Sequence, residues 1–137
     1  MIIMLSADSC RLIMKEQPPP LLTQLQEWSE NSDEVVISAI TYAELIAGAL
    51  LTSSQAEHMT LVQEFCERLE DIVPWGRDAV DAYTSIQQAA MEKGHTLNMN
   101  DAMVAAHALS LDATLYNTNA RQFSNIPGLT QLVYDSD

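Results

Sequence analysis

The chain has 137 residues, of which 47% are hydrophobic and 6% aromatic, so it is long enough for one domain with its own core. Nineteen acidic side chains against six basic ones give a formal net charge of −13, which argues against a general nucleic-acid coat protein. No apolar run is long enough to span a membrane, and Asp8 and Arg11 interrupt the apolar start too early for a signal peptide. We therefore expect one domain over residues 1–137 in a cytoplasmic protein without a membrane partner.

The hydrophobic pattern predicts short buried strands that alternate with helices. In chain order, we expect a strand at 2–5, a brief helix at 12–14, a helix at 21–28, a strand at 35–37, helices at 41–49 and 61–72, a short strand at 72–73, helices at 80–90 and 101–110, and strands at 113–116 and 131–134. Thr41 is expected to cap the third of these helices, and Gly94 to end the fifth. Strands separated by helices throughout predict an α/β fold with a parallel sheet and helices on both faces.

Three acidic residues occupy the same position relative to this predicted sheet. Asp8 follows the first strand, Glu44 follows the second, and Asp101 begins the alanine-rich helix. In parallel α/β sheets, ligands gather beyond the carboxyl ends of the strands, so we expect these side chains to converge there. Converging carboxylates repel one another, and Mg²⁺ or Mn²⁺, which prefer oxygen ligands, would neutralise them. The pattern therefore predicts a divalent-ion site that could activate water against a phosphodiester.

Each of these acids also has a purely structural interpretation. Asp8 could be a turn residue or the N-cap of the first helix. Glu44 lies three residues after Thr41, which is the spacing of a capping box. Asp101, with Asn100 before it, could cap its own helix and interact with the helix dipole. The common position of all three acids beside the sheet is what favours the site.

Three stretches of the chain resemble motifs of VapC-type PIN domains. Residues 37–49 read ISAITYAELIAGA, which is similar to the family's I-S-x-I-T-x-x-E-L-x-x-G segment. Gly94 followed by residues 100–109, NDAMVAAHAL, resembles the family's G…N-D-x-x-I-A-A-H-A-L helix. Residues 117–123, NTNARQF, and 126–129, IPGL, are similar to the closing T-x-N-x-x-x-F…I-x-G-L stretch. The similarity runs almost from end to end of the chain.

The resemblance implies a single PIN domain with an acidic site that binds Mg²⁺ or Mn²⁺ and cleaves RNA. It also implies a homodimer, and a cognate antitoxin protein whose tail enters the acidic site. By position, Glu44 and Asp101 would be the second and third acids of that site. Asn119 is the best candidate for the fourth position, and Thr118 could supply a hydroxyl there instead.

The first acid of the motif has two possible positions. The family has Leu-Asp-Thr-Asn, whereas residues 5–10 of this chain read LSADSC. Counting from Met1 places Ser6 at the position of the acid, and the primary metal ligand would then be missing. Matching the following helix places Asp8 there instead. We prefer Asp8, because Leu12 and Ile13 then lie on the buried face of the helix, whereas the other register puts Ser9 and Arg11 at apolar positions.

The leading hypothesis is a Mg²⁺-dependent endoribonuclease, the toxin of a toxin–antitoxin pair. Asp8, Glu44 and Asp101 would hold the ion, and Asn119 would complete the site or orient water. The alternative is a catalytically degenerate PIN domain that binds protein or RNA, which Ser6 and the neutral Asn119 favour. A response-regulator-like phosphoacceptor domain is set aside because it needs a lysine after a late strand, and the only lysines are Lys15 and Lys93.

Overall fold

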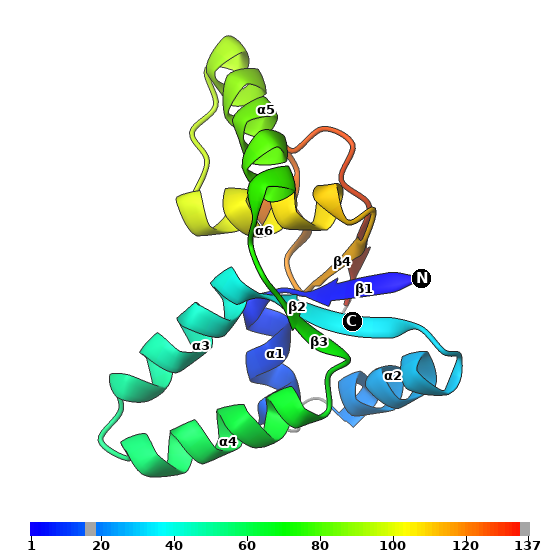
Figure 1. The fold of residues 1–137 in the computed structure, drawn as a ribbon, viewed down its shortest axis with the longest axis vertical. Coiled ribbons are helices and arrows are strands. Elements are labelled where there is room, and N and C mark those ends of the chain that lie inside the picture. The colour runs from blue at the N-terminus through cyan, green and yellow to red at the C-terminus, as the bar shows by residue number, and fades with distance from the viewer. Residues whose placement is uncertain (16–18, 135–137) are drawn as a thin grey trace.

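The computed structural model describes residues 1–15 and 19–134, in which strands and helices alternate along the chain (Figure 1). The elements are β1 (Ile2–Leu5), α1 (Ala7–Met14), α2 (Pro19–Glu30), β2 (Glu34–Ser38), α3 (Ala39–Leu50), α4 (Gln55–Glu67), β3 (Asp71–Val73), α5 (Arg77–Lys93), α6 (Met99–Ser110), β4 (Thr114–Asn117), the short 3-10 helix η1 (Ala120–Phe123) and β5 (Gln131–Val133). The described elements follow the predicted order, and the first helix begins directly after the first strand.

The strands form one parallel sheet in the order β3-β2-β1-β4-β5, with β1 at its centre. Alternate residues of β1 point to opposite faces: Ile3 and Leu5 join the core beneath α1 to α4, and Met4 joins the core beneath α5 and α6. Figure 1 shows the same division, with α1 to α4 on one side of the sheet and α5 and α6 on the other. The predicted α/β class, with a parallel sheet and helices on both faces, is confirmed.

Polar residues at the strand ends begin the helices that lead away from the sheet. Ser38, the last residue of β2, is the N-cap of α3, and its hydroxyl accepts the N–H of Ile40 at 3.1 Å. The predicted cap at Thr41 is therefore wrong. Thr41 lies inside the first turn of α3 and is fully buried, and its hydroxyl has no hydrogen-bond partner among the described residues. Gly94 ends α5 in the left-handed conformation (φ 70°), as expected from the sequence.

The larger core lies beneath α1 to α4. Trp28 of α2 packs edge-on against Tyr116 of β4 with ring centroids 4.8 Å apart, and both side chains are 5% exposed. This contact fixes α2 against the middle of the sheet. None of the helices in the described ranges combines the length and apolarity needed to cross a lipid bilayer.

Candidate active site

A small hollow of about 40 Å³ lies where the carboxyl ends of β1 and β2 meet the start of α6. It is lined by Ser6, Ala7, Asp8, Arg11, Glu44, Asp101, Val104, Gln122 and Phe123. Parallel strands carry their following loops to the same edge of the sheet, and this brings together residues that lie far apart in the sequence. The structure thus places Asp8, Glu44 and Asp101 on one hollow.

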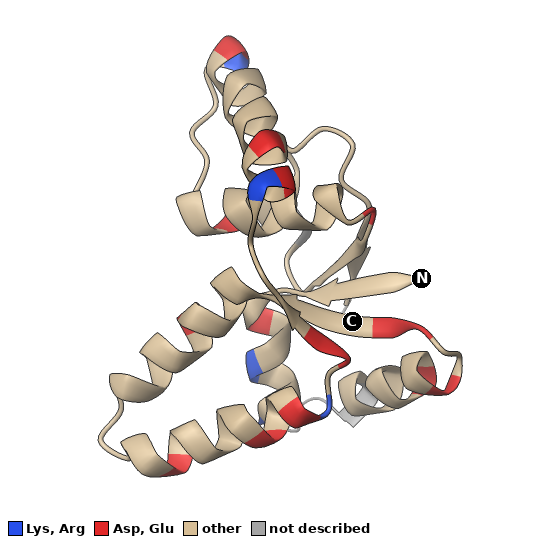
Figure 2. Ribbon diagram, viewed as in Figure 1, with Lys and Arg blue, Asp and Glu red and all other residues tan. Residues whose placement is uncertain are grey.

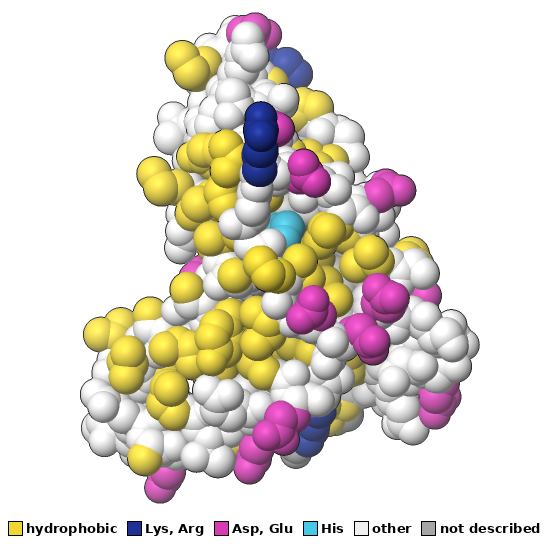
Figure 3. Space-filling view, viewed as in Figure 1, with side chains coloured by type: hydrophobic (Ala, Val, Ile, Leu, Met, Phe, Trp, Pro, Cys, Tyr) yellow, Lys and Arg dark blue, Asp and Glu magenta, His cyan; other side chains and the backbone are white. Residues whose placement is uncertain are grey.

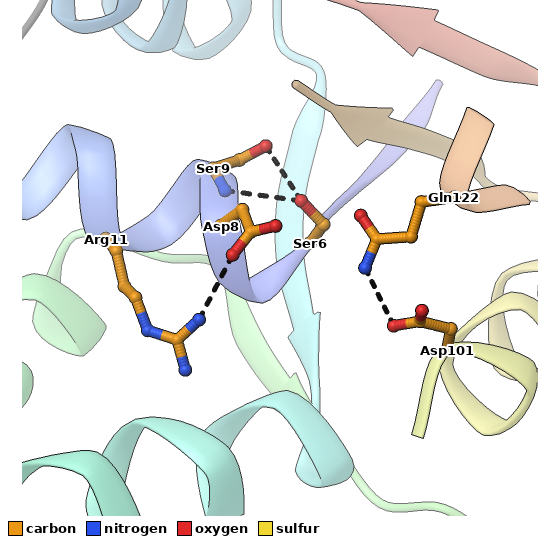
Figure 4. A network of polar contacts seen from close by, with 6 residues as sticks. All are labelled: Ser6, Asp8, Ser9, Arg11, Asp101 and Gln122. Carbon is orange, nitrogen blue, oxygen red and sulfur yellow. Dashed lines mark hydrogen bonds and ion pairs between the residues drawn. The ribbon is translucent and has the colours of Figure 1, made fainter. Parts of the chain in front are cut away.

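Ser6 is the residue that directly follows β1. It is the N-cap of α1, its hydroxyl accepts the N–H of Ser9 at 3.2 Å, and the two serine hydroxyls lie 2.9 Å apart (Figure 4). The Ser9 hydroxyl in turn donates to the carbonyl of Tyr116 at 3.1 Å. Ser9 can be fully buried because its hydroxyl is hydrogen-bonded. The burial of Ser9 on the inner face of α1 is therefore compatible with the register that has Ser6 directly after the strand. The structure therefore has Ser6, rather than Asp8, at the end of the strand.

Asp8 lies in the first turn of α1, at the rim of the hollow. Its carboxylate accepts a hydrogen bond from Arg11, one turn further along, with Oδ1 and Nη1 3.2 Å apart. The side chains are 49% and 42% exposed respectively, so water screens the ion pair. Asp8 faces the hollow but already has a cationic partner within the same helix.

Glu44 and Asp101 are the more enclosed acids, and both have raised pKa values. For Glu44 the main cause is burial, which the nearby Arg11 opposes and which repulsion from Asp101 and Asp8 reinforces. Burial likewise raises the pKa of Asp101, against a lowering by its hydrogen bond from Gln122, and Asp8 raises it further. The hollow therefore holds more negative charge than its own residues neutralise.

Gln122 is the residue of the hollow that the sequence did not reveal. Its amide Nε2 donates to Asp101 Oδ1 at 2.9 Å, and its Oε1 is buried with no hydrogen-bond partner among the described residues. In Figure 4 this oxygen lies on the side of Gln122 that faces Ser6. Glutamine is an uncommon metal ligand, and Gln122 lies in η1, a segment for which the sequence predicted neither a strand nor a helix. No sequence signal therefore pointed to Gln122.

Asn119, the expected fourth site residue, does not line the hollow. It is exposed and is the N-cap of η1, where its Oδ1 accepts the N–H of Arg121 at 3.1 Å. Asn117, at the end of β4, is fully buried and donates through Nδ2 to the carbonyl of Asn119. These contacts shape the turn that carries Gln122 to Asp101, so the predicted segment is near the site while the predicted residue is not in it.

His107 holds together two helices that carry acids of the hollow. It is buried on α6, and its Nδ1 lies 2.7 Å from the hydroxyl of Ser38, the N-cap of α3. Burial lowers the pKa of His107, a shift that its hydrogen bond to the backbone of Pro74 opposes. The contact links the Asp101-bearing helix to the start of the Glu44-bearing helix.

The residues of the hollow fit a hydrated divalent ion better than a closed metal cage. Within residues 1–15 and 19–134, no group of three or more His, Cys, Asp or Glu side chains is arranged to hold a metal ion. Ser6 brings only a hydroxyl to the strand end, and Asp8 is engaged with Arg11. Mg²⁺, however, is commonly held by one or two carboxylates and keeps several waters. Glu44 and Asp101 are a donor set of this kind, and Gln122 on the same hollow has an Oε1 with no hydrogen-bond partner in the part of the chain that the structure describes.

Comparison with known proteins identifies the family. Residues 13–129 match the sequence profile of the PIN domain. The chain belongs to the PIN-domain family. This PIN domain is 30% identical over 129 residues to the "Ribonuclease VapC1" of Haemophilus influenzae (strain R2866), and the matched residues are 94% of this chain and 95% of that protein. It is 29% identical over 126 residues to the "tRNA(fMet)-specific endonuclease VapC" of Salmonella typhimurium, with 92% of each chain covered.

Solved structures of similar chains have the same fold as this PIN domain. The VapBC2 complex of Rickettsia felis, bound to a DNA fragment from its promoter, contains a chain that superposes with a TM-score of 0.92 at 27% identity, covering 98% of this chain and 100% of that one. A chain of the DNA-bound VapBC complex of Salmonella typhimurium superposes with a TM-score of 0.90 at 26% identity, covering 97% and 98%. The predicted resemblance to VapC-type PIN domains is confirmed.

Proposed function

We propose that this PIN domain is an endoribonuclease that uses Mg²⁺ or Mn²⁺ to hydrolyse RNA, and that it is the toxin of a toxin–antitoxin pair. The observation that carries the proposal is the meeting of Asp8, Glu44 and Asp101 at one hollow beside the sheet. The relatives named as VapC ribonucleases, which match nearly the whole chain, support the reaction. The VapBC complexes among the solved structures support an antitoxin partner.

Glu44 and Asp101 are the residues that we expect to hold the ion. Both are partly enclosed, and each has a pKa raised by burial and by neighbouring carboxylates, so a bound cation would relieve their repulsion. Gln122 holds Asp101 through its amide hydrogen bond, and its own buried Oε1, which has no hydrogen-bond partner among the described residues, would be available as a further ligand. A bound divalent ion would supply the positive charge that lowers the pKa of a water and stabilises the leaving oxygen of the phosphodiester.

Asp8 has a smaller part in this proposal than the sequence suggested. Its carboxylate lies at the rim, half exposed, and is paired with Arg11. We propose that Asp8 adds negative charge that attracts the ion and contacts it through water. Asn119 supports η1, which carries Gln122, and acts on the site through that turn.

A second candidate function is a catalytically degenerate PIN domain that binds RNA or protein without cleaving. The specific observation in its favour is that Ser6, the residue directly after β1, has a hydroxyl and no carboxylate. In this case the fold and partner surfaces would persist while the ion binds too weakly for catalysis.

Exposed apolar side chains indicate where a second copy and an antitoxin could bind. Figure 3 shows hydrophobic side chains gathered over α3 and α4 and again over α5 and α6. Exposed hydrophobic residues of these helices or directly beside them include Leu50, Leu51 and Leu61 of the α3–α4 region and Met91 and Met99 of α5 and α6. Acidic residues, by contrast, are spread over many elements of the chain rather than concentrated at the hollow (Figure 2). We propose that these apolar groups serve a homodimer and an antitoxin.

Cleavage of RNA by the purified protein tests the proposal. A mixed RNA pool is incubated with the parent and with Asp101→Asn, with Mg²⁺, with Mn²⁺ or with excess chelator. We expect ion-dependent cleavage by the parent and a loss of about 100-fold or more in the variant, because Asp101 is one of the two carboxylates that we expect to hold the ion. If the parent retains RNA on a filter but does not cut it with either ion, the degenerate binding module is the function.

A further inference from the structure

Arg11 is the only lysine or arginine among the side chains that line the acidic hollow. It lies on α1, one turn after Asp8, and its guanidinium is directed toward the Asp8 carboxylate (Figure 4). It also lines the hollow together with Glu44. The whole chain has six lysines and arginines against nineteen acids, so one of its few cations lies at the hollow that Asp8, Glu44 and Asp101 share.

We propose that Arg11 is a resident counter-cation of the hollow that competes with the divalent ion for the charge of Asp8 and Glu44. This inference rests on the proposed metal-dependent function. Asp8, Glu44 and Asp101 would together bring three negative charges, and the fixed charge of Arg11 reduces the formal total of the hollow to −2. An arginine stays protonated at any physiological pH, so its charge cannot be removed by losing a proton.

The ion and Arg11 would interact unfavourably over the few ångströms that the small hollow allows. The repulsion between a divalent ion and Arg11 has the same magnitude as the attraction of that ion to one carboxylate at the same distance. Arg11 can respond by moving away, because its side chain is 42% exposed and the described contacts hold its guanidinium by one hydrogen bond, to Asp8. Binding of the ion then requires the hydrogen bond between Arg11 and Asp8 to break, and this lowers the affinity of the hollow for the ion.

Calorimetric titration with Mn²⁺ alone tests the inference. The parent is compared with Arg11→Gln, which removes the charge, and with Arg11→Lys, which keeps it. Arg121→Gln is the control for a general change in net charge, since Arg121 is exposed on η1 and does not line the hollow. We expect Arg11→Gln to bind Mn²⁺ roughly tenfold more tightly, equivalent to about 1.4 kcal/mol. Arg11→Lys keeps the charge, and Arg121→Gln removes an exposed charge that water and salt screen, so both should stay within about twofold of the parent.

The outcomes separate this inference from the proposed function. If Arg11→Gln binds Mn²⁺ and the parent does not, the counter-cation is supported while the metal-dependent function of the parent fails. If both bind with the same affinity, or the variant binds more weakly, the counter-cation is refuted and the function stands. If neither binds, both are refuted. Unchanged Mn²⁺ affinity together with weaker retention of RNA by Arg11→Gln would make Arg11 a phosphate contact instead, which also overturns the inference.

Discussion

Replacing Ser6 by Asp should turn the hollow into a stronger divalent-ion site. Ser6 is 3% exposed, lines the hollow and caps α1 by accepting the N–H of Ser9. Aspartate is as good an N-cap as serine, so the helix should begin as it does now. The change therefore adds a carboxylate beside Glu44 and Asp101 while leaving the local backbone in place.

The size of the effect follows from the charge already present. The pKa values of Glu44 and Asp101 are raised, so a further carboxylate should weaken the metal-free fold. Each unit of pKa shift corresponds to about 1.4 kcal/mol, and we expect a loss of about 1–2 kcal/mol without metal. Mn²⁺ at about 100 times its Kd should return about 2.7 kcal/mol. For a chain of this length, that is a rise in Tm of roughly 10 °C.

Thermal unfolding with and without Mn²⁺ measures this prediction. Ser6→Asn is the matched control, because asparagine caps the helix and has the size of aspartate but carries no charge. We expect Ser6→Asp to melt below Ser6→Asn without metal and to gain more from Mn²⁺ than either Ser6→Asn or the parent. An equal response of the two variants to Mn²⁺ would show that the strand end does not face a cation site.

Three further predictions concern the stability of the fold. Because the pKa of Glu44 is raised above its ordinary 4.5, its ionised form weakens the metal-free fold at pH 7, and Glu44→Gln should raise the Tm there. The gain should shrink as the pH falls toward 4, where the parent carboxyl becomes largely protonated in both the folded and the unfolded state. A gain that is the same at both pH values would exclude the charge as its cause. Trp28→Ala removes the edge-on contact with Tyr116 and should cost about 3–5 kcal/mol in urea unfolding; a loss below about 1 kcal/mol would mean that α2 contributes little to the core. Thr41→Val removes a buried hydroxyl that has no partner within residues 1–15 and 19–134, and it should leave the free energy of unfolding unchanged or raise it by about 1 kcal/mol. A loss of that size would reveal a partner such as a buried water.

The sequence predicted the order of the elements because the relevant signals are local. Buried parallel strands appear as short apolar runs, and their connecting helices appear as apolar residues at helical spacing. The two motifs that carry Glu44 and Asp101 were recognisable for the same reason, since each is confined to one strand end and one helix. Even the end of α5 at Gly94 follows from a single residue that tolerates a positive φ.

The predictions about caps were less successful because neighbouring hydroxyls compete for the same role. Ser38 and Thr41 can both accept a backbone N–H, and only the end of β2 decides that Ser38 does so. After the first strand, Ser6 and Asp8 were both candidates for the first site position, and the choice depended on whether Ser9 could be buried. The carbonyl of Tyr116, supplied by β4, makes that possible.

By itself, the sequence determined the α/β class, the PIN-domain motifs and the presence of acidic residues in the first two turns of three helices. The tertiary structure decided which side chains meet: Gln122 rather than Asn119 contacts Asp101, and Arg11 shares the hollow with Glu44. The physical reason is that these contacts join segments far apart in the chain, such as Ser9 and Tyr116 at a separation of 107 residues. Periodicity reports which face of an element is buried, and the pairing of β1 with β4 then determines what that face meets.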